Sequence, residues 1–193
     1  VHANTNDSTI KTTVDSWYKT NIEDKGYSKY LSTAVGFCGD RSIYSDGDGV
    51  QSDKVTYFGA YGRYAKNIAQ FTCPEPSRDL YTTRDSDIGN KALTYPVGLI
   101  TYDEMVFAGM DKGHINKLSW LYSDKHSWTM SPAYFDSTNA QARLWIEDET
   151  GFLYPWASTS KSYSARPVIN LKADVEISGG VGTSNDPFVI KIE

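Results

Sequence analysis

Apolar positions near the start of the chain recur with the period of a helix. They are Ile10, Val14, Trp17 and Ile22. This spacing places them along one side of a 3.6-residue repeat and predicts a helix over residues 8–22. Asp7 or Ser8 can cap its first turn, because a short polar side chain accepts a hydrogen bond from a free backbone N–H there. A second, short helical piece is expected over residues 28–35.

The middle of the chain mixes turn residues with short apolar runs. Residues 54–61 predict a short strand that leads into a glycine-containing turn, and residues 93–100 predict an extended, buried segment. A Thr-x-x-Glu capping box that begins at Thr101 predicts a short helix over residues 102–108. The polar stretch of residues 74–90 is expected to be irregular.

Strand patterns dominate the last third of the chain. Residues 142–146 and 152–154 predict a hairpin, because alternating apolar and polar positions flank a turn that ends in Gly151. Further strands are expected over residues 166–172 and 187–192. Helices early in the chain and short antiparallel strands later predict an α+β fold with little regular structure.

Composition favours one domain that is rich in aromatic side chains. The chain has 193 residues, of which 13% are aromatic, including 14 tyrosines and 5 tryptophans. Tyrosine and tryptophan serve both cores and contact surfaces, so their number alone does not separate the two roles. Trp17 lies on the apolar side of the first predicted helix, and we expect both Trp17 and Trp128 in the core.

The charge balance and the lack of long apolar runs exclude two classes of partner. The formal net charge is −5, and lysines and arginines form no cluster, so a nucleic-acid backbone is not an expected partner. No apolar run approaches the ~18 residues that a membrane helix needs, so no membrane insertion by this chain is expected. The polar start, Val1–Asp7, does not have the pattern of a signal peptide.

The chain has two cysteines, Cys38 and Cys73. In a sequence rich in Tyr, Trp, Ser, Thr and Gly, we interpret them as a disulfide of an exported protein. Closing a loop of this length stabilises a fold by about 3–4 kcal/mol in the chain-entropy model. The alternative interpretation is a pair of buried free thiols in a cytosolic protein.

Candidate catalytic and metal-binding groups are few. The three histidines have no metal-ligand spacing; they are His2, His114 and His126. Residues 46–49 invite a calcium interpretation, but the EF-hand pattern fails, and an acidic glycine turn explains them better. Glycosidases use two acids held in a cleft, but the adjacent acids Glu147–Glu149 are better explained as part of a solvated turn. We therefore expect no metal, no cofactor and no catalytic residue.

Several stretches of the sequence together resemble one bacterial family. They are Asn4–Lys11, Trp17–Tyr18, Phe37–Ser42, Tyr57–Tyr61, Ala92–Thr101, Trp128–Pro132, Arg166–Leu171 and Asp186–Ile190. The family is a domain of unassigned function found in surface proteins of Firmicutes and related Gram-positive bacteria. The resemblance spans nearly the whole chain.

The resemblance implies a fold and a domain organisation. The family is similar to the C-type-lectin-like fold, in which two helices flank short antiparallel sheets with long ordered loops. That fold is shared with formylglycine-generating enzymes, whose activity needs cysteines late in the fold, and this chain has none after Cys73. Residues 1–193 would form a single lectin-like surface domain, or a fragment of a larger multi-module protein.

The resemblance also suggests a binding surface. Six residues lie where the lectin-like fold displays its contact loops: Tyr134, Phe135, Asp136, Tyr154, Trp156 and Tyr163. We predict that they bind a glycan or an extracellular protein. The alternative is that their rings only pack against long loops.

Three functions are consistent with the sequence. The first is a non-catalytic recognition module at the extracellular or cell-wall surface. The second is an enzyme of the formylglycine-generating or glycoside-hydrolase type, which requires a cleft with convergent acids or an open metal site. The third is a ligand-free structural spacer in a surface stalk. The spacer predicts that four rings are all buried: Tyr134, Tyr154, Trp156 and Tyr163.

Overall fold

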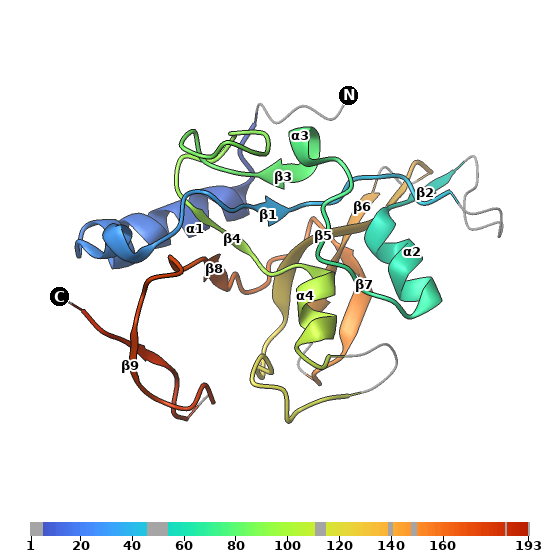
Figure 1. The fold of residues 1–193 in the computed structure, drawn as a ribbon. Coiled ribbons are helices and arrows are strands. Elements are labelled where there is room, and N and C mark those ends of the chain that lie inside the picture. Colours follow the sequence, from blue (N-terminus) through green and yellow to red (C-terminus); the bar gives the residue numbers. More distant parts are fainter. Residues whose placement is uncertain are drawn as a thin grey trace.

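The computed structural model has the predicted α+β architecture, with short helices and several small antiparallel sheets (Figure 1). It describes residues 6–45, 54–110, 115–138, 141–147 (backbone only), 150–183 and 185–192. The helices are α1 (Thr9–Tyr18), α2 (Gly59–Lys66), α3 (Pro76–Asp79) and α4 (Tyr102–Phe107), with a π-helical turn over Lys19–Glu23 and a 3₁₀ turn over Tyr27–Tyr30.

The largest sheet has four strands in the order β2-β5-β6-β7, and all of its pairings are antiparallel. Its strands are β2 (Val55–Tyr57), β5 (Ser127–Asp136), β6 (Gln141–Glu147) and β7 (Leu153–Ser158). Three two-stranded sheets complete the fold. They are β1 (Phe37–Cys38) with β3 (Leu80–Tyr81), β4 (Val97–Leu99) with β8 (Pro167–Ile169), and β9 (Ile177–Gly179) with β10 (Val189–Ile190).

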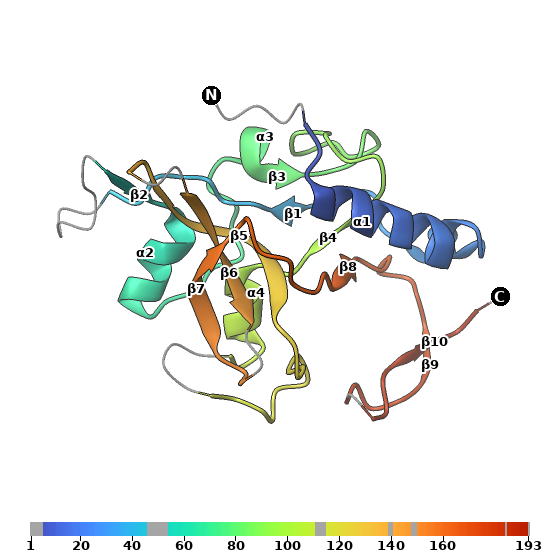
Figure 2. The ribbon, with the colours of Figure 1, turned by 180° about the vertical axis from the view of Figure 1, so that it is seen from behind.

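The helices cover the sheets unequally. Helix α4 lies in front of the four-stranded sheet in Figure 1 and behind it in Figure 2, so it covers one face of that sheet. Helix α2 lies beside β7 in both views. Helix α1 lies away from this sheet and packs along β4.

Two clusters of buried side chains form the core. The first joins α1 to β4 and β5; its buried members are Val14, Tyr18, Leu31, Val97, Leu99, Trp128 and Ala157. The second joins α2 and α4 to β5 and β7; its buried members are Ala60, Tyr102, Met105, Met110, Leu121, Ala133 and Leu153. Trp128 is buried as predicted, and Trp17 is partly buried against the first cluster.

The two helices with clear capping residues form where the sequence predicts them. The Ser8 hydroxyl accepts a hydrogen bond from Lys11 N (3.1 Å) and caps α1. At α4, Thr101 Oγ1 accepts from Glu104 N (3.2 Å) while Glu104 Oε2 accepts from Thr101 N (2.8 Å). The predicted capping box is therefore confirmed.

Helix α2 was not predicted, because its sequence is poor in helix formers. The stretch after β2 looks like a glycine turn, and glycine costs about 1 kcal/mol in a helix relative to alanine. Packing decides the conformation instead. Ala60 is fully buried, and Gly62 lies so close to the Tyr44 ring that a Cβ there would be 2.1 Å from a ring carbon. The glycine that weakens the helix signal is the residue that lets Tyr44 approach.

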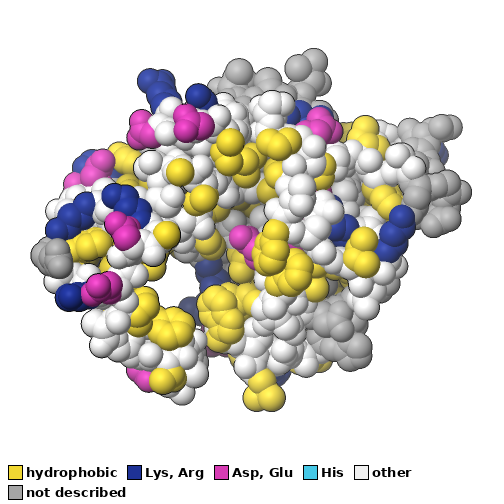
Figure 3. Space-filling model, viewed as in Figure 1, with side chains coloured by type: hydrophobic (Ala, Val, Ile, Leu, Met, Phe, Trp, Pro, Cys, Tyr) yellow, Lys and Arg dark blue, Asp and Glu magenta, His cyan; other side chains and the backbone are white. Residues whose placement is uncertain are grey.

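Other predicted elements differ in extent. The second helical piece is only the 3₁₀ turn over Tyr27–Tyr30, because Leu31 already forms a bridge with Leu171. The stretch of residues 74–90 holds α3 and β3. The last predicted strand exists as β10, and its partner β9 was missed. Figure 3 shows this C-terminal hairpin separated from the rest of the molecule by a gap.

The predicted disulfide is present. Cys38 and Cys73 are joined, with their Cα atoms 5.6 Å apart, so β1 is tied to the segment that follows α2. Both cysteines of the chain are therefore used. Among the described helices, none has the length and apolar character to cross a membrane.

A buried carboxylate sits beside this disulfide. Asp79 is fully buried, and its oxygens accept hydrogen bonds from the side chains of Arg41 (Nε, 2.7 Å) and Arg78 (Nη2, 2.8 Å) and from Arg41 N (2.8 Å). Burial alone raises the pKa of Asp79, but the hydrogen bonds from Arg78 and Arg41 outweigh it and lower the pKa.

Asp79→Asn should lower the free energy of unfolding by about 2–3 kcal/mol at neutral pH. The folded-state pKa lies below the ordinary value of 3.8, so the carboxylate stabilises the fold above that value. This contribution is lost as the pH falls through the lowered folded pKa. Urea unfolding of both proteins at about pH 7 and about pH 3 should therefore show the difference shrinking in acid. An equal difference at both pH values would contradict this role.

Candidate functional site

Three of the predicted contact residues lie in a strand, not in a loop. Tyr134, Phe135 and Asp136 end β5, which pairs with β2 on one side and β6 on the other. Pro132 lies inside β5. The β5–β6 register shifts on both sides of Pro132, and such bulges accommodate a proline inside a strand.

Tyr154 and Trp156 also lie in a strand. Along β7 they alternate with Leu153, Pro155 and Ala157, which are buried, whereas each of the two rings is 40% exposed. This alternation is typical of a strand with one buried side. Tyr154 falls within the strand predicted over residues 152–154, and β7 continues to Ser158, so strand pairing also fixes the position of Trp156.

The structure brings rings from four elements together. The Tyr134 and Trp156 ring centroids are 5.3 Å apart, and Tyr57, opposite Tyr134 in register, lies 5.5 Å from it. Tyr61 of α2 lies 4.3 Å from Tyr57 and 6.2 Å from Trp156. We call Tyr57, Tyr61, Tyr134 and Trp156 the aromatic face. Aromatic pairs at these separations stabilise each other beyond their buried area, so the face holds its own shape.

Tyr57 and Tyr61 were not among the predicted site residues. Tyr57 ends β2 and Tyr61 lies in the first turn of α2, so the approach of their rings can be predicted only if α2 is known to begin at Gly59. The missed helix thus explains the missed residues.

The aromatic face carries neutral hydroxyls and one nearby carboxylate. Burial, with the phenols of Tyr57, Tyr64 and Tyr134, raises the pKa of Tyr61, so its hydroxyl stays protonated at physiological pH. Asp136 follows Tyr134 by two residues and shares its side of β5. Asp136 Oδ1 accepts a hydrogen bond from Thr138 N (2.9 Å).

Of the six predicted residues, Tyr134 and Trp156 belong to the aromatic face. Asp136 and Tyr154 share a strand side with them, whereas Phe135 and Tyr163 lie elsewhere. Phe135 is 38% exposed, but strand alternation places it on the opposite side of β5 from Tyr134. Tyr163 packs against Trp128 at 4.9 Å and stacks on His126 at 5.0 Å, as part of the first core cluster. His126 lies in the loop just before β5 and is partly buried.

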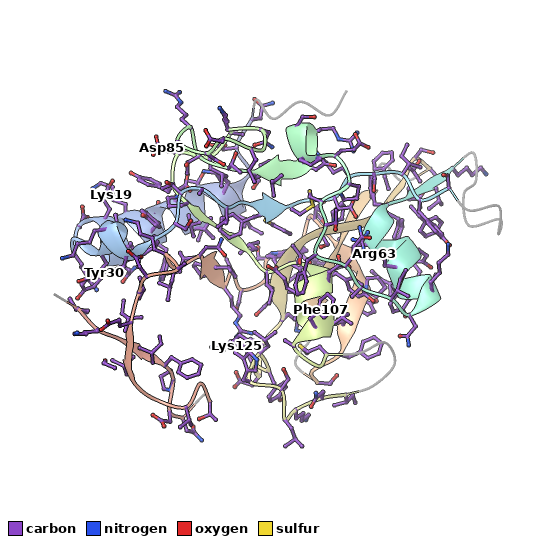
Figure 4. All side chains as sticks on the ribbon, in the orientation of Figure 1. Lys19, Tyr30, Arg63, Asp85, Phe107 and Lys125 are labelled. Carbon is purple, nitrogen blue, oxygen red and sulfur yellow. A yellow bond between two sulfur atoms is a disulfide. The ribbon has the colours of Figure 1, made fainter. Side chains whose placement is uncertain are left out.

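A buried arginine organises the region between α2 and α4, where Figure 4 labels it. Arg63 donates two hydrogen bonds to Asp103, from Nε and Nη2, each 2.6 Å long. Its Nη1 also lies 2.6 Å from Asp40 Oδ2. Burial lowers the pKa of Arg63, but these carboxylates outweigh that effect and the pKa is raised. Arg63 is therefore a permanent cation that joins two segments of chain to α2.

Two cavities, of about 330 and 80 Å³, lie away from the aromatic face, and none of its four rings lines either of them. The described part of the chain contains no group of three His, Cys, Asp or Glu residues placed to hold a metal. The turn of residues 46–49, the acids Asp148 and Glu149, and His2 and His114 lie outside the described residues, as does the side chain of Glu147.

Comparison with protein-family models, with curated proteins and with solved structures finds no match in any of the three.

Proposed function

We propose that this protein is a non-catalytic extracellular recognition module that binds a glycan through the aromatic face. The observation that carries the proposal is the partial exposure of Trp156 and Tyr154 within a structured sheet. Rings that only filled the core would be covered, whereas these two keep much of their surface in water while Tyr134 and Tyr61 support Trp156.

A glycan suits this surface better than a protein does. Sugar rings present C–H faces that pack on aromatic rings and hydroxyls that bond to polar tips, and tyrosine and tryptophan offer both. The neutral phenol of Tyr61 and the carboxylate of Asp136 supply such polar groups beside the rings. A protein ligand is the other candidate class, and the experiment below separates the two.

The proposal includes the C-type-lectin-like fold and the Gram-positive surface location. The α+β architecture with small antiparallel sheets supports that fold class. The Cys38–Cys73 disulfide supports an oxidising compartment, because disulfides persist outside the reducing cytosol.

The two competing functions have less support. A formylglycine-type enzyme needs free cysteines, and both cysteines are in the disulfide. A spacer predicts four buried rings, but Tyr154 and Trp156 are each 40% exposed. The hydrolase alternative rests on Glu147–Glu149, whose side chains lie outside the described residues.

Trp156→Ala should weaken glycan binding by about tenfold or more, because a central aromatic anchor of an interface typically contributes at least 1.4 kcal/mol. A glycan array identifies ligands, and calorimetry with the best of them measures the loss. The matched control is Trp120→Ala, which removes another exposed tryptophan outside the aromatic face. Thermal melts of both variants verify that they fold.

Two outcomes would count against this function. A blank array together with Trp156-dependent capture of an extracellular matrix protein would move the ligand class to protein. Binding that Trp120→Ala weakens as much as Trp156→Ala would show that the aromatic face is not the binding surface.

A further inference from the structure

Two phenylalanines stack on each other at the surface, away from the aromatic face. Phe71 and Phe107 have ring centroids 4.0 Å apart and nearly parallel planes, at 13°. They come from separate elements, the segment before Cys73 and the end of α4, where Figure 4 labels Phe107. Phe71 is 71% exposed and Phe107 is 54% exposed. Stacking buries one side of each ring and leaves a flat apolar platform in water.

A small cavity opens beside this platform. Its volume is about 80 Å³, and Phe71 is one of its walls. The polar or charged residues that line it are Asp40, Arg63, Gln70, Thr72, Thr101, Asp103 and Glu104. Figure 3 shows acidic side chains next to a hydrophobic patch on this side of the molecule. Platform and cavity therefore form one continuous feature.

The cavity has an excess of negative charge. Three carboxylates and a single guanidinium line it, which gives a formal charge of −2. Arg63 occupies both oxygens of Asp103, so that carboxylate is satisfied. The charge of Glu104 has no cationic partner, because both of its described hydrogen bonds come from Thr101 and end on Oε2.

One carboxylate oxygen at the cavity retains the capacity to accept hydrogen bonds. Glu104 Oε1 has no partner among the described residues. Asp40 Oδ2 is buried, and Arg63 Nη1 balances its charge at 2.6 Å. A cationic donor that enters the cavity would therefore pair with Glu104.

We propose that this cavity binds the primary ammonium group of a hexosamine whose sugar ring rests on the Phe71–Phe107 platform. An ammonium offers three donors and a positive charge, which match the open Glu104 oxygen and the excess negative charge of the cavity. Its attraction to the adjacent rings adds a cation–π contribution. The choice of a glycan as carrier rests on the proposed function; the preference for an ammonium does not.

The size of the cavity favours a small charged group over a whole sugar. Water occupies about 30 Å³ in the liquid, so the cavity holds the equivalent of two or three waters. An ammonium fits that space, while a sugar ring is left outside on the platform. An N-acetyl group would replace the charge and two of the three donors by a methyl and a carbonyl. Acetylation of the amine should therefore abolish the preference.

The test compares a glucosamine tetramer with its fully N-acetylated counterpart by calorimetry at about pH 6, where glutamate is ionised. The free amine form should bind about tenfold or more tightly than the acetylated form. Glu104→Gln should remove that preference, and glutamine keeps the capping box of α4, so the fold is retained. Phe71→Ala should weaken the amine form. The matched controls are Glu176→Gln and Phe188→Ala on the C-terminal hairpin, which change equivalent groups elsewhere.

The outcomes separate this site from the aromatic face. Equal affinity for the two tetramers would overturn the inference. A preference for the amine that Glu176→Gln reduces as much as Glu104→Gln does would also overturn it, because the attraction would then be a non-specific effect of charge. Tighter binding of a lysine peptide than of the glucosamine tetramer would overturn the glycan carrier. If Glu104→Gln removes amine binding while Trp156→Ala leaves every glycan unaffected, the inference stands and the proposed function fails. If Trp156→Ala abolishes glycan binding while Glu104→Gln leaves the preference for the amine unchanged, the inference fails and the proposed function stands.

Discussion

Arg63→Met should lower the free energy of unfolding by about 3–5 kcal/mol. The substitution keeps much of the apolar bulk but leaves Asp40 and Asp103 buried without their cation. A buried charge that loses its partner costs far more than a surface pair gains. Urea unfolding measures the loss as a lower midpoint at an unchanged slope.

Two further variants identify the cause as charge. Adding Asp103→Asn to Arg63→Met should recover part of the lost stability, because it removes one of the stranded carboxylates. Lys19→Met breaks exposed ion pairs with Glu23 and Asp24 and should leave the midpoint unchanged. If Arg63→Met and Lys19→Met behave alike, the buried pairs do not hold α2 to the rest of the fold.

Loss of the disulfide should cost a comparable amount. The Cys38→Ser, Cys73→Ser double variant should be less stable by about 3–4 kcal/mol, because the bond closes a loop between residues 35 apart in sequence. Thermal melts of the wild-type protein with and without reductant should show the same loss. Reductant should not affect the double variant. A melting temperature that reductant does not change would show that the bond contributes nothing to stability.

The sequence predicts the elements whose local signals agree with their packing. Helices α1 and α4 carry a capping serine and a complete capping box, and these local hydrogen bonds form as predicted. Helix α2 is held by Ala60, Gly62 and the ion pairs of Arg63, which are contacts with distant segments. A local pattern carries no information about such contacts.

The candidate site shows the same difference between local sequence signals and long-range contacts. Tyr134, Trp156 and Tyr154 were predicted from the resemblance to the lectin-like fold, which places contact loops at these positions. Tyr57 and Tyr61 reach the same place only because β2 pairs with β5 and α2 begins immediately afterwards. Tyr163 looks like its neighbours in sequence but packs on Trp128. Long-range pairing between elements therefore decides which of these rings join the aromatic face.

The C-terminal hairpin should open independently of the two core clusters, so the molecule does not unfold as one cooperative unit. Neither core cluster includes a described residue of β9 or β10, and two paired strands alone are only marginally stable in water. The amide protons of this hairpin therefore exchange with solvent through local opening, long before the clusters around Trp128 and Tyr102 open. Phe188 and Ile177, each more than half exposed, belong to this easily opened unit. Any neighbour that covered them would have to order this segment and bear the entropic cost of doing so.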